Sequence, residues 1–306
     1  MRFTLLDIGR CVAILLLLTA HVAQTTGGVL GAFWGIRGFY YVSLGGLAVT
    51  IFLVQSGMAL ALRYRGESID YPLFMVKRCL RIYPVYYLSL AGGLLLYALN
   101  SYSDTGSLLS YFSTLGFGDV LLSITGFYPF AGKWGGPFVK TSWFIGLIMS
   151  MYLLFPLLSH LIKKHPHISI CALLLVSTLS RIILGRYGVL PMRPLDWFPL
   201  CRVFEFSLGI YLITVVRTKM PDALIATGRE VPLISFISEL SFPLFLIHYP
   251  LLFVIPYLER HGLSETTSIL GYIVLSLILS WIVHAIDNRI PRAFLLQKAG
   301  AKVKRA

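Results

Sequence analysis

The chain has 306 residues, of which 57% are hydrophobic and 13% are charged, and its mean hydropathy is +0.79. A soluble domain carries about 25% charged residues, so this composition excludes a string of soluble domains and indicates one polytopic membrane protein. The formal net charge of +13 does not indicate nucleic-acid binding, because the cations cluster in short loops between apolar runs. We therefore expect an all-α membrane bundle in which residues 1–306 form a single transmembrane domain.

The first predicted helix covers about 8–26 and carries ionisable groups on one side. Eleven residues at about 100° each place Arg10 and His21 on the same face, roughly 16 Å apart. Asp7 precedes Arg10 by three residues and can pair with it there. Because ionisable groups in a membrane helix are expensive, we expect His21 to act as a general base, with Arg10 and Asp7 as a charge anchor near the membrane surface. The alternative is a histidine that only packs against a neighbouring helix.

A second helix is predicted over about 39–62, and a Ser-Gly pair lies near its inner end. Glycine at such a position permits the close approach of another helix or of a ligand. Ser56 and Gly57 are therefore candidates for cofactor binding, although close helix packing explains the same pattern.

A basic cluster precedes the third predicted helix, which covers about 82–99. Arg78 and Arg81 lie three residues apart and project on one side of the helix start. Arginine binds phosphate through paired donors of fixed geometry, so these two residues are candidates for cofactor binding. The alternative is the ordinary positive charge found at cytoplasmic helix ends.

The middle of the chain decides the predicted topology. An apolar piece at 111–130 is broken by glycines, and if it dips into the membrane and returns, the cytoplasmic side holds the excess of cations. We therefore expect about eight spans (eight to ten) plus a re-entrant segment, in the plasma (inner) membrane, with both termini and a basic tail at 289–306 in the cytoplasm. The remaining helices are predicted over about 142–162, 168–185, 198–217, 234–258 and 266–288.

Three later residues are candidates for binding the substrate. Glu205 lies three residues after Arg202 at a predicted helix start, where the two also suit a structural ion pair. Trp143 falls near the outer membrane boundary, where an aromatic ring either belongs to the interface belt or stacks on a sugar. His248 is expected in mid-helix before a kinking proline, in a structural or a site role. The four cysteines are scattered without metal-ligand spacing, and no metal site is expected.

These segments, taken in order, resemble the acyltransferase-3 family of integral membrane acyltransferases. The match is spread over the chain and rests on Leu6-Asp7-Ile8-Gly9-Arg10 with His21, Phe52-Leu53-Val54-Gln55-Ser56-Gly57, Arg78-x-x-Arg81-Ile82-Tyr83-Pro84-x-Tyr86, Trp143-Phe144 with Tyr152-Leu153-Leu154-Phe155-Pro156, Arg202-Val203-Phe204-Glu205-Phe206 with Gly209, and Leu240-Ser241 through Leu246-Ile247-His248-Tyr249-Pro250.

The chain departs from the family pattern in two ways. Many members carry adjacent glutamates five and six residues after the tryptophan, where this chain has Ile148 and Met149. If a carboxylate is needed, Glu205, Glu239 or Asp287 has to supply it. The chain is also about two spans shorter than the usual ten. Some branches of the family lack those glutamates, so we interpret their absence as a subfamily difference rather than as loss of activity.

The resemblance implies an acyl-CoA-dependent O-acyltransferase of the cell envelope. It moves an acyl group, usually acetyl, from cytoplasmic acyl-CoA (acetyl-CoA) to a hydroxyl of a cell-surface saccharide or lipid-linked glycan, and so modifies polysaccharides by O-acetylation. Arg78 and Arg81 then hold CoA phosphates, while His21 deprotonates the acceptor hydroxyl or passes on the acyl group. Membrane lipid and the glycan are the expected partners, and nucleic acid is not.

Two other classes of function remain open on the sequence. In a proton-coupled transporter of a small solute or glycolipid, Asp7, Arg10 and His21 would form a proton or substrate relay. The lack of visible internal symmetry counts against this class. The second class is a non-catalytic membrane scaffold, and the missing glutamates keep this class open.

Overall fold

A computed structural model describes residues 4–26, 44–65, 69–107, 115–131, 133, 135–187, 197–216, 231–292 and 296. These residues form helices and no strand, which confirms the predicted all-α class. Within these described ranges, seven helices are long and apolar enough to cross a membrane. They are α1 (Thr4–Thr26), α2 (Leu44–Arg63), α3 (Tyr71–Thr105), α5 (Trp143–Lys164), α6 (Pro166–Tyr187), α7 (Pro199–Tyr211, continued by the π-helical Leu212–Val216) and α11 (Glu265–Asn288). The shorter helices are α4 (Phe117–Thr125), α9 (Pro232–Ile247) and α10 (Val254–Arg260).

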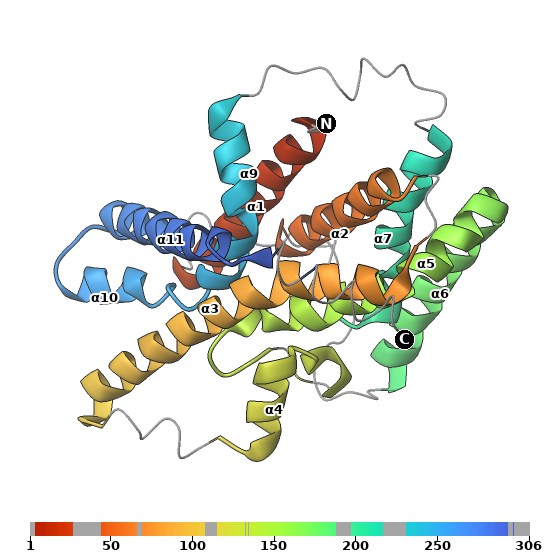
Figure 1. Ribbon diagram of the computed structural model, residues 1–306. Coiled ribbons are helices and arrows are strands. Elements are labelled where there is room, and N and C mark those ends of the chain that lie inside the picture. Colours follow the sequence, from red (N-terminus) through yellow and green to blue (C-terminus); the bar gives the residue numbers. More distant parts are fainter. Residues whose placement is uncertain are drawn as a thin grey trace.

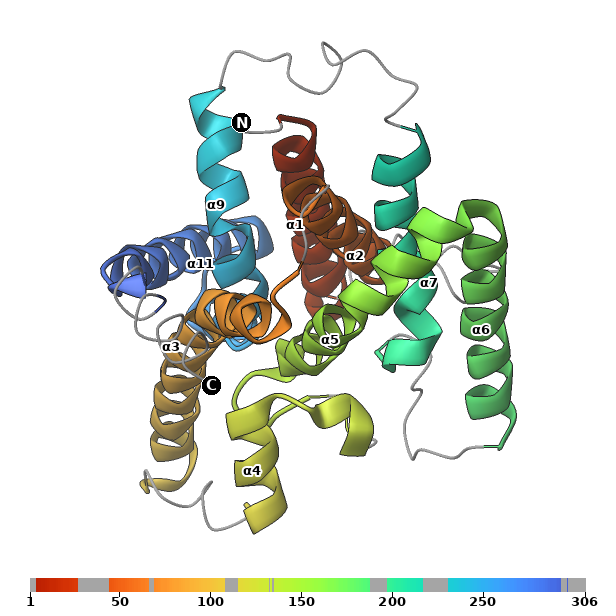
Figure 2. The ribbon, with the colours of Figure 1, turned by 45° about the vertical axis from the view of Figure 1, so that its right-hand side comes forward.

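The helices pack into one bundle with α1 and α2 near its centre (Figure 1). On one side α2 packs against α7, and α6 covers α7 from outside. On the other side α9 packs against α1, α3 and α11. The starts of α1 and α9 and the end of α7 lie together at one end of the molecule, whereas α4 lies at the other end (Figure 2). We call these the N-terminal end and the α4 end.

Two glycines bring α2 and α7 close together. A Cβ atom added at Gly57 would lie 2.0 Å from the backbone oxygen of Phe206, and one added at Gly209 would lie 1.9 Å from that of Val54. No side chain fits at such distances, so the two helices cross with backbone against backbone. Gly57 thus fixes the position of the wall of α2 that carries Ser56.

Helix α3 begins at Tyr71, eleven residues before residue 82, so the predicted start of this helix was wrong. Asp70 caps the helix, since its carboxylate accepts a hydrogen bond from the Leu73 N–H (3.1 Å), and Pro72 follows in the first turn. Arg78 and Arg81 therefore lie inside the helix, in its second and third turns, rather than at its start. Because of these extra turns, the helix itself positions both guanidinium groups on the wall of the bundle.

The span predicted over 234–258 is broken, and this is the difference between the eight expected spans and the seven long helices. Helix α9 ends at Ile247, a turn covers residues 248–253, and α10 begins at Val254. Pro250 has no N–H and disfavours helical geometry in the residue before it, which explains the end of α9. His248 is therefore the C-cap residue of α9 and not a mid-helix residue.

The apolar piece predicted at 111–130 contains α4, whose nine residues rise about 13 Å and are too few to cross a bilayer. Three tyrosines of α3 donate hydrogen bonds to the last carbonyls of α4: Tyr83 to Thr125 O (3.0 Å), Tyr86 to Ser123 O (2.6 Å) and Tyr87 to Ile124 O (3.0 Å). At its start, hydrogen bonds from Lys133 and from the Gly116 N–H lower the pKa of Asp119. The re-entrant placement in the membrane stays a prediction.

Candidate active site

A cavity of about 430 Å³ opens among α1, α2, α3, α5, α9 and α11. Its lining combines cations, two carboxylates and aromatic rings. The cations are Arg10, Lys77, Arg78, Arg81 and Arg292; the acids are Glu239 and Asp287; the rings are Phe52, Phe144, Tyr152, Phe242 and Phe245, with Ser56, Ile148, Ser238, Ser241 and His284 among the others. This lining suits an elongated ligand with an anionic part and an apolar part.

The two arginines of α3 reach the same cavity because they lie three residues apart on one helix face. The guanidinium carbon of Arg78 lies 5.5 Å from the ring centre of Phe74 and 5.8 Å from that of Tyr152, a cation–π arrangement that holds the side chain in place. Its Nε atom is buried and has no hydrogen-bond partner among the described residues. An anion in the cavity would satisfy such a donor.

Asp7 and Arg10 form the predicted pair, and the structure adds a third member. Asp7 Oδ1 lies 3.4 Å from Arg10 Nη1 and accepts a shorter hydrogen bond from Ser238 Oγ of α9 (2.6 Å). Asp7 is buried, whereas Arg10 remains partly exposed and lines the cavity. The carboxylate therefore joins the starts of α1 and α9 and holds the guanidinium of Arg10 at the cavity wall.

His21 and His248 meet inside the bundle. His248 Nε2 lies 2.8 Å from His21 Nδ1, and His248 Nδ1 lies 2.9 Å from the carbonyl oxygen of Leu244. His21 is 7% exposed and His248 is fully buried. The sequence indicated each histidine singly; the contact between α1 and α9 brings them together. Neither histidine lines the cavity.

Phe52, Phe144 and Phe245 form an aromatic layer on the cavity wall, and Phe245 also approaches the histidine pair. The ring centre of Phe245 is 5.8 Å from that of Phe52 and 4.7 Å from that of Phe144, and all three side chains line the cavity. On its other side the Phe245 ring is 6.3 Å from the His248 ring. Phe245 thus lines the cavity on the one hand and neighbours the His248 imidazole on the other.

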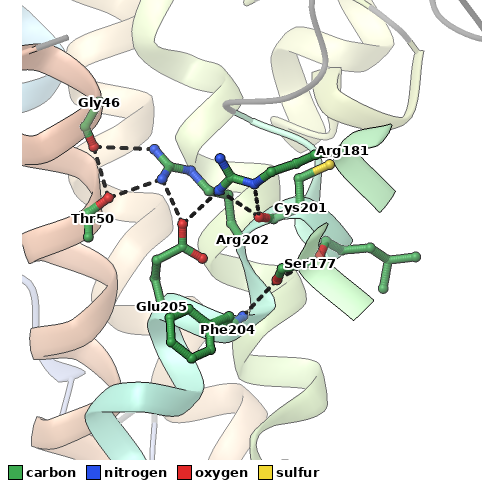
Figure 3. Close-up of polar contacts among 9 residues, drawn as sticks. Gly46, Thr50, Ser177, Arg181, Cys201, Arg202, Phe204 and Glu205 are labelled. Carbon is green, nitrogen blue, oxygen red and sulfur yellow. Dashed lines mark hydrogen bonds and ion pairs between the residues drawn. The ribbon is translucent and has the colours of Figure 1, made fainter. Parts of the chain in front are cut away.

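The predicted carboxylate of Glu205 lies away from the cavity, in a polar network at the interface of α2, α6 and α7 (Figure 3). Its Oε1 atom accepts from Arg202 Nη1 (2.9 Å) and from Arg181 Nη2 (2.8 Å), and Arg202 also donates to Thr50 Oγ1 (3.0 Å). Arg181 donates to the Cys201 carbonyl as well (3.0 and 2.8 Å). These contacts join α2, α6 and α7, and they give Glu205 a structural role as the partner of Arg202 and Arg181.

Two other predicted residues also lie off the cavity. Gly57 is at the crossing of α2 with α7, and Trp143 is a buried residue at the start of α5 whose ring lies 6.1 Å from that of Phe144. Of the two predicted positions on α2, only Ser56 lines the cavity.

The position of the missing glutamates is apolar in the structure. Ile148 is fully buried against the cavity, and Met149 is buried without lining it. Carboxylates reach the cavity from other helices instead: Glu239 of α9 lies 3.7 Å from His284 Nε2, and Asp287 of α11 pairs with Arg292. Among the described residues, no group of three or more His, Cys, Asp or Glu side chains is placed to hold a metal ion.

Sequence reasoning did not single out Ser238 or Phe245, although a signal was present. Ser238, Ser241, Phe245 and His248 follow one another at spacings of three, four and three residues, which is the period of one helix face. This face of α9 supplies the contact to Asp7, part of the cavity wall, the aromatic layer and the partner of His21.

A family model described as an acyltransferase domain (Acyl_transf_3) matches residues 3–222. This is more than half of the chain. The chain belongs to the acyltransferase-3 family. It is accordingly a membrane acyltransferase, which requires an acyl donor and an acceptor. No curated protein and no solved structure matches the chain.

The family match includes α1 to α7 but ends before α9. The predicted site residues Arg10, His21, Arg78 and Arg81 thus lie inside the matched region. The contacts that complete their surroundings come from the part of the chain after it, from α9 and α11.

Proposed function

We propose that this acyltransferase moves an acyl group, with acetyl as the first candidate, from acyl-CoA to a hydroxyl of a cell-surface saccharide or lipid-linked glycan. The observation that carries the proposal is the cavity lined by Arg10, Lys77, Arg78, Arg81 and Arg292. Coenzyme A carries three phosphate groups at its nucleotide end. A long, less polar arm extends from them and ends in the sulfur that forms the thioester. A cavity with cations along its wall and aromatic rings at one boundary fits a ligand of that kind.

The same charges support a proposed orientation of the bundle in the membrane. Arg10 lies in the second turn of α1, Lys77 and Arg81 line the same cavity as Arg10, and Lys163 and Lys164 are the last two residues of α5. Cytoplasmic surfaces of membrane proteins are enriched in lysine and arginine. We therefore place both termini and the cavity on the cytoplasmic side of the plasma (inner) membrane, where acyl-CoA is available, and the α4 end outside, where the glycan is available.

His21 is the proposed general base. The acceptor hydroxyl gives its proton to His21 while its oxygen attacks the thioester carbon, the carbon–sulfur bond breaks, and the sulfur of CoA leaves as a thiolate. The proton held by His21 then goes to that sulfur, so the products are the O-acyl ester and the free thiol of CoA. No oxidant, reductant or metal is required for this balance.

The aromatic layer sets a condition on this reaction. Because neither histidine lines the cavity and Phe245 lies against both the cavity and His248, we expect this ring to turn aside when the thioester meets the base. Aromatic side chains rotate about two torsions, so such a movement needs no rearrangement of the helices. The acyl group, rather than the nucleotide, is the part that has to pass.

The test uses purified protein in lipid nanodiscs, with acetyl-CoA and candidate glycans as substrates. We expect glycan-dependent release of free thiol, with transfer of radiolabelled acetyl to the glycan. His21→Ala should abolish both, while binding of labelled CoA persists. Solute uptake into proteoliposomes without thiol release would overturn the proposal in favour of a transporter. CoA binding that is intact, with no turnover on any glycan hydroxyl, would favour a non-catalytic scaffold.

A further inference from the structure

We propose that His248 is a positioning residue that holds His21 in the tautomer with its proton on Nδ1, so that the basic lone pair of His21 is on Nε2. The inference rests on the proposed function, in which His21 is the base. It assigns the reacting nitrogen, and it gives the α9 histidine a role through His21 instead of a direct contact with substrate.

The first step concerns His248 Nδ1, which lies 2.9 Å from the carbonyl oxygen of Leu244. A carbonyl oxygen only accepts hydrogen bonds, so the nitrogen facing it must carry a proton. In a neutral imidazole only one nitrogen carries a proton, and the lone pair of His248 is then on Nε2.

The second step follows from the 2.8 Å separation of His248 Nε2 and His21 Nδ1. When both rings are neutral, Nε2 of His248 can only accept, so His21 must donate from Nδ1. The lone pair of His21 is therefore on Nε2. A proton taken up there leaves Nδ1–H and the hydrogen bond to His248 as they were, so the base changes its charge without turning its ring.

The third step is that His248 is rigidly held. It caps α9 at the point where Pro250 ends the helix, and it is fully buried. Helices α1 and α9 are also joined at the N-terminal end, where Ser238 donates to Asp7 (2.6 Å). Two polar contacts, ten residues apart on α9, thus fix the register of α1 and α9, and with it the orientation of His21.

The kinetic experiment compares three variants with the wild-type enzyme in nanodiscs. His248→Gln keeps an acceptor oxygen near the position of Nε2, whereas His248→Phe keeps the ring and removes the acceptor. We expect His248→Phe to lower kcat about 100-fold with KM for acetyl-CoA unchanged, since residues that orient a reacting imidazole contribute effects of that order. We expect His248→Gln to recover at least a tenth of the wild-type kcat.

His261→Phe is the matched control. His261 also contacts the carbonyl four residues before it, through Nδ1 and Tyr257 O (2.8 Å), but it is exposed at the end of α10. Its replacement should leave kcat and KM as in the wild type. A kcat for His248→Phe within about threefold of this control would overturn the inference. Equal loss in His248→Gln and His248→Phe would also overturn it, because it would show that His248 must itself accept a proton.

A second measurement does not depend on turnover, and it reads the tautomer from the wild-type protein itself. Solid-state ¹⁵N spectra of wild-type protein labelled in its histidine rings distinguish protonated from unprotonated ring nitrogens, and the His21 signals are assigned by their loss in His21→Ala. We expect protonated Nδ1 and unprotonated Nε2. The opposite tautomer would refute the role of His248 even if His21 proves essential, whereas activity that survives His21→Ala would refute the proposed function itself.

Discussion

Arg81 is the exposed member of the cation set that lines the cavity, whereas Arg78 is held against two aromatic rings. On the proposed function, Arg81→Ala removes a charge-assisted hydrogen bond to a CoA phosphate, worth about 1.5–3 kcal/mol, so KM for acetyl-CoA should rise about 10- to 100-fold with little change in kcat. Initial rates at varied acetyl-CoA measure this effect. Arg65→Ala is the control, because Arg65 is an exposed cation nearby in sequence that does not line the cavity. An equal rise in KM for both variants would mean that general surface charge, not a site, attracts the donor.

At this scale the sequence predicted residues that share one helix but not those that meet across helices. The spacing of Asp7, Arg10 and His21 follows from 3.6 residues per turn, and the contact between Asp7 and Arg10 is present in the structure. Ser238 and His248 join this face only because α9 packs against α1. Pattern reasoning within one helix does not contain that information.

The crossing of α2 and α7 depends on glycine at one point, which makes it testable by a single methyl group. Gly57→Ala places a Cβ atom within 2.0 Å of the Phe206 carbonyl, so α7 must move away. We expect a loss of stability above about 2 kcal/mol, since overpacking of a close contact costs about 1–3 kcal/mol and the obstacle here is backbone. Thermal unfolding in detergent measures it.

Gly92→Ala in α3 is the matched control, because nothing lies within 4 Å of an added Cβ atom there. Alanine is the better helix former, so this variant should be as stable as the wild type or more stable. Comparable melting temperatures for Gly57→Ala and Gly92→Ala would show that α2 and α7 are not in close contact.

The end of α4 depends on hydroxyl groups of α3. Tyr86 is fully buried and donates to Ser123 O (2.6 Å), so Tyr86→Phe leaves a buried carbonyl with one donor fewer and should cost about 1–3 kcal/mol. Tyr87 makes the equivalent bond to Ile124 O (3.0 Å) from an exposed position, and Tyr87→Phe should cost well under 1 kcal/mol. Hydrogen exchange of the α4 amides reports the difference. Faster exchange in Tyr87→Phe than in Tyr86→Phe would contradict this assignment.

Long apolar segments were predicted to within a few residues, because length and hydropathy fix a spanning helix. Two boundaries were wrong for local reasons. The cap formed by Asp70 with Pro72 starts α3 early, and Pro250 divides the last predicted helix but one. Both signals are present in the sequence, but the apolar pattern outweighed the first, and the second was interpreted as a kink rather than as a break.

For the whole molecule, the prediction concerns which end faces the cytoplasm. Lys133 is near α4, and Arg65 follows α2 at the opposite end. In a background with the four native cysteines replaced by serine, Lys133→Cys should react with a membrane-impermeant maleimide in intact cells. Arg65→Cys should react only after the membrane is opened. The reverse pattern would place the cation-lined cavity outside and separate it from cytoplasmic acyl-CoA.

The aromatic layer of Phe52, Phe144 and Phe245 has a consequence for the cell as well as for the reaction. If water filled a passage from the cation-lined cavity to the far side of the bundle, ions would flow down their electrochemical gradient. This leak would continue even in the absence of substrate. The three rings pack with centres 4.7–6.4 Å apart on the wall of the cavity, and we expect this apolar packing to exclude water and ions there. If the donor and the acceptor meet the enzyme from opposite compartments, as proposed, this seal lets the reaction proceed without draining the gradient between them.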